Sequence, residues 1–172
     1  MTDDDSTNAA RLRRLDRWMY AGGRPNRVAR MMNRFAVAHF ASGVFARRNR
    51  VTLEVPGRTT GRVISVPVVL ADHEGARYLV AMLGGRTNWV HNVRAAEGVA
   101  VLRLRGRLRV GVRLVEVDPA ERAPVLRRYL ELAPGGRAHI PVGVQAPLEE
   151  FEKIAQDVPV FRVTRPGGAA KA

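Results

Sequence analysis

Apolar and polar residues alternate along much of the chain from residue 51 onward, which is the spacing typical of half-buried β-strands. Val51, Leu53 and Val55 interleave with Thr52 and Glu54, and Pro56 and Gly57 end this first stretch. The same reasoning predicts further strands over residues 63–70, 78–82, 99–105, 107–117 and 158–163. Turns are expected at residues 73–75 and at Gly106. The pattern therefore predicts six strands.

The apolar phase of the strand at 107–117 shifts by one residue after Leu114, where Val115 and Val117 take over. A strand that bulges or bends, as strands do when they curve into a barrel, would explain this shift.

Three helices are predicted between the strands. One begins at Thr87 or Asn88 and runs to about Ala95. A second follows Asp118-Pro119-Ala120-Glu121, which offers a capping carboxylate and a proline at the first helical position, and it should end near residue 132. A third covers residues 148–156. Helices inserted between antiparallel strands predict a mixed, mainly β fold built on a barrel.

The length and composition narrow the possibilities further. A chain of 172 residues suits one compact domain, and the absence of cysteine excludes disulfides, thiolate nucleophiles and cysteine-based metal centres. The four histidines have no metal-ligand spacing, so no metal site is expected.

The first 45 residues form a separate basic segment. Eleven arginines between Arg11 and Arg50 face a single acid, Asp16, and contribute to a formal net charge of +13. Apolar residues at helical spacing predict two amphipathic helices there, separated by Gly22, Gly23 and Pro25. Two interpretations remain open: the helices cap the barrel, or they dock on an anionic membrane surface through residues such as Trp18, Met19 and Phe35.

Three segments are therefore expected: a basic helical segment (1–45), the barrel domain (46–165) and a flexible tail (166–172). The acidic start, Asp3 to Asp5, argues against a secretory signal. No apolar stretch reaches the roughly 20 residues of a membrane span. We expect a soluble cytoplasmic protein, with peripheral membrane contact through residues 11–45 as an open alternative.

No motif for a protein nucleophile, a nucleotide-binding loop or an acid–base pair stands out, which favours chemistry carried by a cofactor. One segment suits an anion: the Gly57–Arg62 loop combines two glycines, Thr59, Thr60, Arg58 and Arg62. An ordinary polar turn between two strands would look the same.

A second candidate lies at 84–94, where Gly84 and Gly85 lead into a predicted helix start that favours anionic groups. Trp89 on this helix could pack on a cofactor ring, or it could belong to the core together with Val93.

Taken together, these segments resemble the deazaflavin-dependent nitroreductases of actinobacteria and the related quinone reductases. The resemblance covers roughly residues 45–165 and rests on an ordered series of short motifs. They are Gly57-Arg58-x-x-Gly61, Val66-Pro67-Val68, Tyr78-Leu79-Val80-Ala81, Gly84-Gly85, Trp89-x-x-Asn92-x-Arg94-Ala95 and Pro159-Val160-Phe161.

The resemblance implies a split β-barrel of the FMN-binding type that binds coenzyme F420 and passes a hydride from its reduced form to a quinone, nitroaromatic or enone-like acceptor. It assigns the cofactor's phosphate and acidic tail to Arg58, Thr59, Thr60, Gly61 and Arg62. It assigns the ring to Val66, Pro67, Val68, Ala81, Met82, Leu83, Gly84 and Gly85, with Trp89, Asn92 and Arg94 supporting the pocket.

The chain also departs from the family pattern. Thr59 stands where the nitroreductases commonly have lysine, and their substrate-side tyrosines have no clear counterpart here except Tyr129. The catalytic residues are thus left unassigned, and homodimerisation is expected only by analogy with the fold.

Two rival functions follow from the same residues. An FMN-dependent enzyme or FMN carrier would use the same loop for its phosphate. A non-catalytic basic module for membranes or nucleic acid would explain the arginines, but no nucleic-acid motif supports it, and we expect no nucleic-acid partner.

Overall fold

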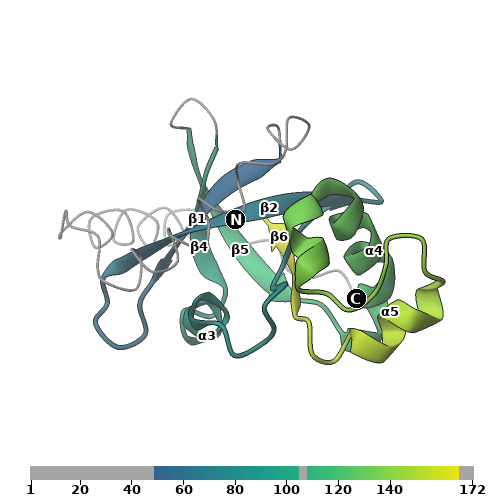
Figure 1. Ribbon diagram of the computed structural model, residues 1–172. Coiled ribbons are helices and arrows are strands. Elements are labelled where there is room, and N and C mark those ends of the chain that lie inside the picture. Colours follow the sequence, from purple (N-terminus) through teal and green to yellow (C-terminus); the bar gives the residue numbers. More distant parts are fainter. Residues whose placement is uncertain (1–48, 105–107, 167–172) are drawn as a thin grey trace, which may run out of the picture.

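The computed structural model describes residues 49–104 and 108–166, and its centre is a closed barrel (Figure 1). Six antiparallel strands close in the order β1-β2-β3-β6-β5-β4. Their bounds are Arg50–Pro56 (β1), Val63–His73 (β2), Ala76–Val80 (β3), Val99–Arg103 (β4), Arg109–Glu116 (β5) and Val160–Thr164 (β6). The predicted mainly β fold and its six strands are therefore confirmed.

The alternating strand directions give the barrel two distinct ends. At the glycine-loop end, β1, β3 and β5 finish and the Gly57–Arg62 loop leads into β2. At the opposite end, which we call the mouth, β2, β4 and β6 finish and β3 and β5 begin.

The barrel interior is filled by the inward-facing residues of all six strands and by one helix. Leu53, Leu79 and Phe161 are almost completely buried there. The helix α3 (Asn88–Ala95) adds Trp89 and Val93 to this cluster, and the Trp89 ring lies 5.4 Å from that of Phe161. The helix thus closes the core beside the glycine-loop end.

Gly98, which joins α3 to β4, lies close against the backbone of β5. Its φ of +78° is one that side chains rarely adopt, and an added Cβ would lie 2.2 Å from the carbonyl oxygen of Leu114. Only glycine fits at this close approach.

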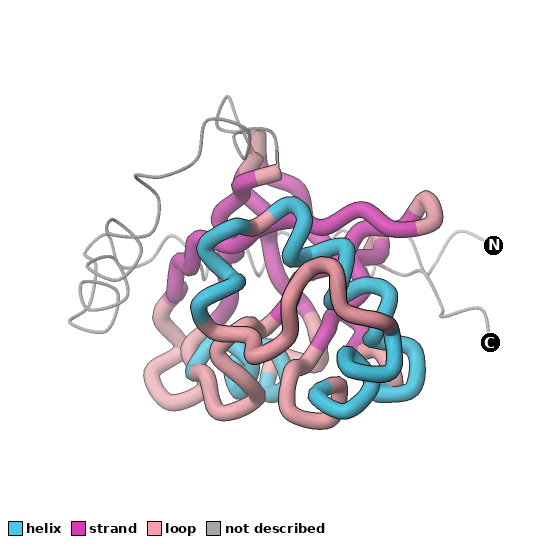
Figure 2. Tube along the Cα trace, turned by 45° about the vertical axis from the view of Figure 1, so that its right-hand side comes forward, coloured by secondary structure: helices cyan, strands magenta, loops and turns pink. Residues whose placement is uncertain are grey.

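A second apolar cluster covers the outer face of β2, β3 and β6. It is formed by α4 (Arg122–Leu132), α5 (Leu148–Ile154) and the short helix η4 (Pro134–Ala138), all of which lie to one side of the barrel (Figure 2). A short helix, η3 (Pro119–Glu121), leads into α4, and Asp118 caps it by accepting a hydrogen bond from the amide of Ala120. The predicted helix starts at Asp118 and Leu148 are confirmed.

Of the bulge or bend predicted near Leu114, the bulge is wrong. β5 pairs without interruption with β4 through Arg113 and with β6 from Arg113 to Glu116. The apolar phase shifts because Leu114 faces the barrel core, whereas Val117 packs against the second cluster outside the barrel. A strand covered on both faces needs no irregularity to carry such a pattern.

The predicted N-terminal helices, with Trp18, Met19 and Phe35, lie outside the described residues, as does the tail after Pro166. Among the helices of the described part of the chain, none has the length and apolar character of a membrane span.

Candidate functional site

The Gly57–Arg62 loop is a tight turn held by its own backbone. The amide of Gly57 donates to the carbonyl of Arg62, and the amide of Gly61 donates back to the carbonyl of Gly57, each at 2.8 Å. Gly61 has a φ of +68°. Because these bonds use the backbone of the loop ends, the side chains of Arg58, Thr59 and Thr60 stay exposed.

Arg58 is held in place by α3. Its backbone amide and one guanidinium nitrogen donate to Oδ1 of Asn92 at 3.2 and 3.1 Å, and the guanidinium also reaches Oδ1 of Asn88 at 3.4 Å. Asn88 and Asn92 are four residues apart and therefore share one face of the helix. Both acceptors are neutral amides, so Arg58 is oriented and its positive charge is not cancelled.

Asn92 is 1% exposed, and its Nδ2 has no hydrogen-bond partner among the residues that the structure describes. The two Arg58 donors fix the orientation of the amide, because they require an oxygen facing them. A buried unpaired N–H group is rare. Because Nδ2 is buried, Asn92 acts on the site by orienting Arg58.

The N-terminus of α3 lies next to this arginine. Thr87 occupies the capping position but makes no side-chain cap; its hydroxyl donates instead to the carbonyl of Gly84 at 3.0 Å. Gly84, with a φ of +82°, turns the chain from Ala81 towards the helix. An uncapped helix start presents amide donors to an anion.

The residues assigned to the cofactor ring occupy both faces of the barrel wall. Val66 is buried in the barrel core and Val68 packs against it, so both point inward. Pro67 lies between them on the outer face, next to Val69, which packs against the helical cluster. Of this predicted motif, only Pro67 lies on the surface where a ligand ring could rest.

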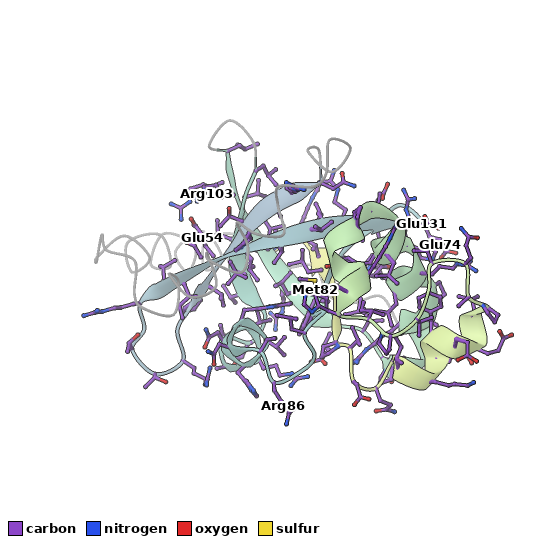
Figure 3. All side chains as sticks on the ribbon, viewed as in Figure 1. Glu54, Glu74, Met82, Arg86, Arg103 and Glu131 are labelled. Atoms are coloured by element: carbon purple, nitrogen blue, oxygen red, sulfur yellow. The ribbon has the colours of Figure 1, made fainter. Side chains whose placement is uncertain are left out.

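The segment after β3 likewise has some residues in the core and others at the surface. Ala81 is buried in the core, whereas Leu83 is 56% exposed. Met82 lies beside α4, and Arg86 points outward near α3 (Figure 3).

Tyr129 on α4 is 3% exposed, and its hydroxyl donates to the sulfur of Met82 at 3.2 Å. Burial raises the pKa of the phenol well above its ordinary value, so it remains protonated. Tyr129 therefore contacts Met82 from the side of α4, and its own hydroxyl does not reach solvent.

Arg94 forms a two-pronged ion pair with Glu116, with contacts of 2.7 and 2.9 Å. Glu116 also accepts from the buried Arg122, which donates in addition to the carbonyls of Val117 and Ala155. Together these contacts join α3, β5, α4 and the end of α5. The guanidinium of Arg94 is thus committed to the frame that positions α3.

Two participants in these contacts were not predicted from the sequence. Asn88 was expected only as a helix cap, and Glu116 was not singled out. The spacing of Asn88 and Asn92 on one helix face would have suggested a shared partner, but the identity of that partner depends on which loop the fold brings near.

The donor set suits a phosphate or a carboxylate tail. It combines an oriented, uncancelled arginine, an uncapped helix start and two exposed threonines. Within the described residues, no group of three or more acidic or histidine side chains could hold a metal ion.

Comparison with known proteins places this site in context. The model of the family described as F420H(2)-dependent quinone reductase matches residues 27–147, a span that includes the loop, α3 and α4. No curated protein matches the sequence.

Solved structures resemble the chain at low sequence identity, and two of those compared have TM-scores above 0.5. The chain resembles Atu2129 of Agrobacterium tumefaciens, of unknown function, at 14% identity and a TM-score of 0.52, covering 84% of this chain and 56% of that one. It resembles Rv2991, a conserved hypothetical protein of Mycobacterium tuberculosis, at 13% identity and a TM-score of 0.51, covering 77% and 79%. An F420-H2 dependent reductase, FDR-A, is 23% identical with a TM-score of 0.46 over 67% of this chain and 94% of that one.

Proposed function

The chain belongs to the F420H(2)-dependent quinone reductase family, an enzyme family whose cofactor is coenzyme F420, and from this membership we propose that it reduces a quinone-type acceptor. The observation that carries the proposal at the level of residues is the state of Arg58. Its guanidinium is fixed by two neutral asparagines and keeps its full charge for an anionic ligand.

We assign the phosphate and acidic tail of the cofactor to Arg58 and the N-terminus of α3, with the buried Asn92 holding Arg58 in place. Thr59, Thr60 and Arg62 are exposed on the same loop and extend this cationic surface. A charge-assisted contact from a prepositioned arginine is worth roughly twice a neutral hydrogen bond. Orientation by Asn88 and Asn92 lowers the entropy lost when the ligand binds.

The ring would lie on the outer face of the barrel wall, against Pro67 and the segment from Met82 to Gly85. Tyr129 holds Met82 from the side of α4, which keeps this surface in one shape. Trp89 and the Arg94–Glu116 ion pair support it by fixing α3.

When bound, the reduced deazaflavin supplies a hydride, and the acceptor takes up a proton to complete its reduction. Solvent supplies that proton in our proposal, because the Tyr129 hydroxyl is buried and donates to Met82. The protein contributes by positioning the two reactants. Nitroaromatic and enone-like compounds are further electron-poor acceptors to be screened beside quinones.

The test is a fluorescence titration of the purified protein with oxidised F420, run beside FMN. We expect saturable F420 binding and much weaker FMN binding. Arg58→Gln should reduce F420 affinity by about 10-fold to 100-fold, the range for one charged contact. Arg113→Gln is the matched control, because Arg113 is exposed on β5 away from the loop and should leave the affinity unchanged.

Tight FMN binding without F420 binding would overturn the proposed cofactor. Equal losses in the two variants would mean that only the overall positive charge of the protein attracts F420, and would remove Arg58 from the site.

A further inference from the structure

The mouth of the barrel holds a cavity of about 630 Å³, far from the glycine-loop end. That volume lies within the range of small-molecule sites, roughly 300–1,000 Å³. A smaller hollow of about 450 Å³ adjoins it and shares Leu70, Arg77 and Leu104 with it. The mouth is therefore a continuous recess.

The walls of this recess are aliphatic. Val110 and Leu108 on the β5 side are 38% and 59% exposed, which is unusual for residues of a barrel interior. Deeper in, the wall continues into the barrel core. The aliphatic lining of the larger cavity consists of Leu70, Leu102, Leu104, Val110, Val112 and Val163. Such a surface gains free energy when an apolar ligand covers it.

The rim of the recess is cationic. Arg77, Arg162 and Arg165 line the cavity. Arg77 lies two residues before the fully buried Leu79 on β3, so it stands on the inner face of the barrel. Within the described residues, these three side chains form no ion pair or hydrogen bond. The one acid lining the smaller hollow, Asp72, is already paired with Arg128.

We propose that the mouth binds an apolar molecule with an anionic head, of the fatty-acid class. The aliphatic wall would cover the hydrocarbon chain, and Arg77 and Arg165 would bind the carboxylate. This site is separate from the one assigned to the cofactor. It lies at the other end of the barrel and shares no residue with it.

A dansyl-labelled undecanoic acid tests the proposal on the full chain. We expect saturable binding, seen as enhanced and blue-shifted dansyl fluorescence. The double variant Arg77→Gln/Arg165→Gln should weaken binding by about tenfold or more, as expected for the loss of charged contacts. The methyl ester of the probe should bind the wild type and the double variant equally, because it carries no charge.

Arg113→Gln serves again as control, since it removes one positive charge, half of what the double variant removes, from an exposed strand position outside the recess. Val110→Asp should also weaken binding of the labelled undecanoic acid, because it places a negative charge on the wall of the recess. No saturable binding to the full chain, or equal losses in the Arg113 control and the double variant, would overturn the proposal.

Excess F420 should not displace the probe. Displacement would mean that the mouth is a cofactor site, which also overturns the proposal. F420 titration of the double variant keeps this test separate from that of the enzyme function, because its F420 affinity should remain that of the wild type.

Discussion

Both ends of the barrel carry arginine side chains, but the surroundings of these arginines differ. At the glycine-loop end, Arg58 is held by neutral amide oxygens on α3, and backbone donors lie beside it. At the mouth, Arg77 and Arg165 have no ion-pair partner among the described residues and stand above exposed aliphatic side chains. The positive charge is common to both, so the neighbouring groups must determine which ligand each end selects. A polar, preorganised cradle suits a phosphate, and an apolar wall with a charged rim suits an amphiphile.

The two ends of the barrel also differ in how tightly their side chains are packed. Substitutions that test this difference should give the largest change in the free energy of unfolding. Trp89→Ala removes a buried ring that contacts Phe161, and it should lower the free energy of unfolding by about 3–5 kcal/mol. Val110→Ala at the mouth is the matched control and should cost less than about 1 kcal/mol, because the side chain is already partly exposed. Urea denaturation measures both. Similar losses would show that the mouth is as tightly packed as the end closed by α3.

Whether the neutral surroundings of Arg58 matter for F420 binding can be tested by replacing the side-chain amide of Asn92 with a carboxylate. Asn92→Asp keeps an oxygen facing the guanidinium and adds a negative charge that cancels it. We expect F420 affinity to fall by about tenfold, measured by fluorescence titration. Asn88→Asp adds the same charge at an exposed and longer contact, so its effect should be smaller. If Asn92→Asp bound F420 as tightly as the wild type, the free charge of Arg58 would play no part in binding.

The smallest effect concerns the ion pair that fixes α3. The hydrogen bond from Arg94, followed by the charges of Arg94 and Arg122, lowers the pKa of Glu116 below its ordinary value of 4.5. A lowered pKa in the folded state means that ionised Glu116 stabilises the fold above pH 4.5 and that this contribution is lost as the pH falls through the lower, folded value.

Glu116→Gln should therefore be less stable than the wild type by about 1 kcal/mol at neutral pH. The figure is modest because the Arg94–Glu116 pair is partly exposed and the glutamine oxygen can still accept a hydrogen bond from the buried Arg122. The gap should shrink as the pH falls below 4.5. Chemical denaturation at a series of pH values measures it. A gap that does not change with pH would show that the charge of Glu116 contributes nothing.

Much of the fold could be predicted from local patterns. Alternation of apolar residues located the six strands, and the Asp118-Pro119 pair located the start of the helical segment before α4. Local patterns misjudged β5 because they assume one buried face. Near Leu114 the strand packs against the barrel core on one face and, at Val117, against the helical cluster on the other. The second contact depends on α4 and α5, which are distant in the chain.

The candidate site was predicted only in part, for a similar reason. The loop at Gly57–Arg62 and the helix start at Asn88 were predicted to bind an anion, and the structure brings the two together, but the contact between Arg58 and Asn92 spans 34 positions. The pairing of Arg94 with Glu116 spans 22. Val66 and Val68 looked equivalent to Pro67 in the motif, and only the strand's place in the closed barrel turned them inward.

The sequence by itself determined the elements, the family and the cofactor class, because glycine positions, strand alternation and short motifs are local properties of the chain. Only the tertiary structure decided which arginines of the described residues are paired, which are not, and at which end of the barrel each one lies. Barrel closure places residues from separate strands side by side, and the strength of a charge depends on those neighbours.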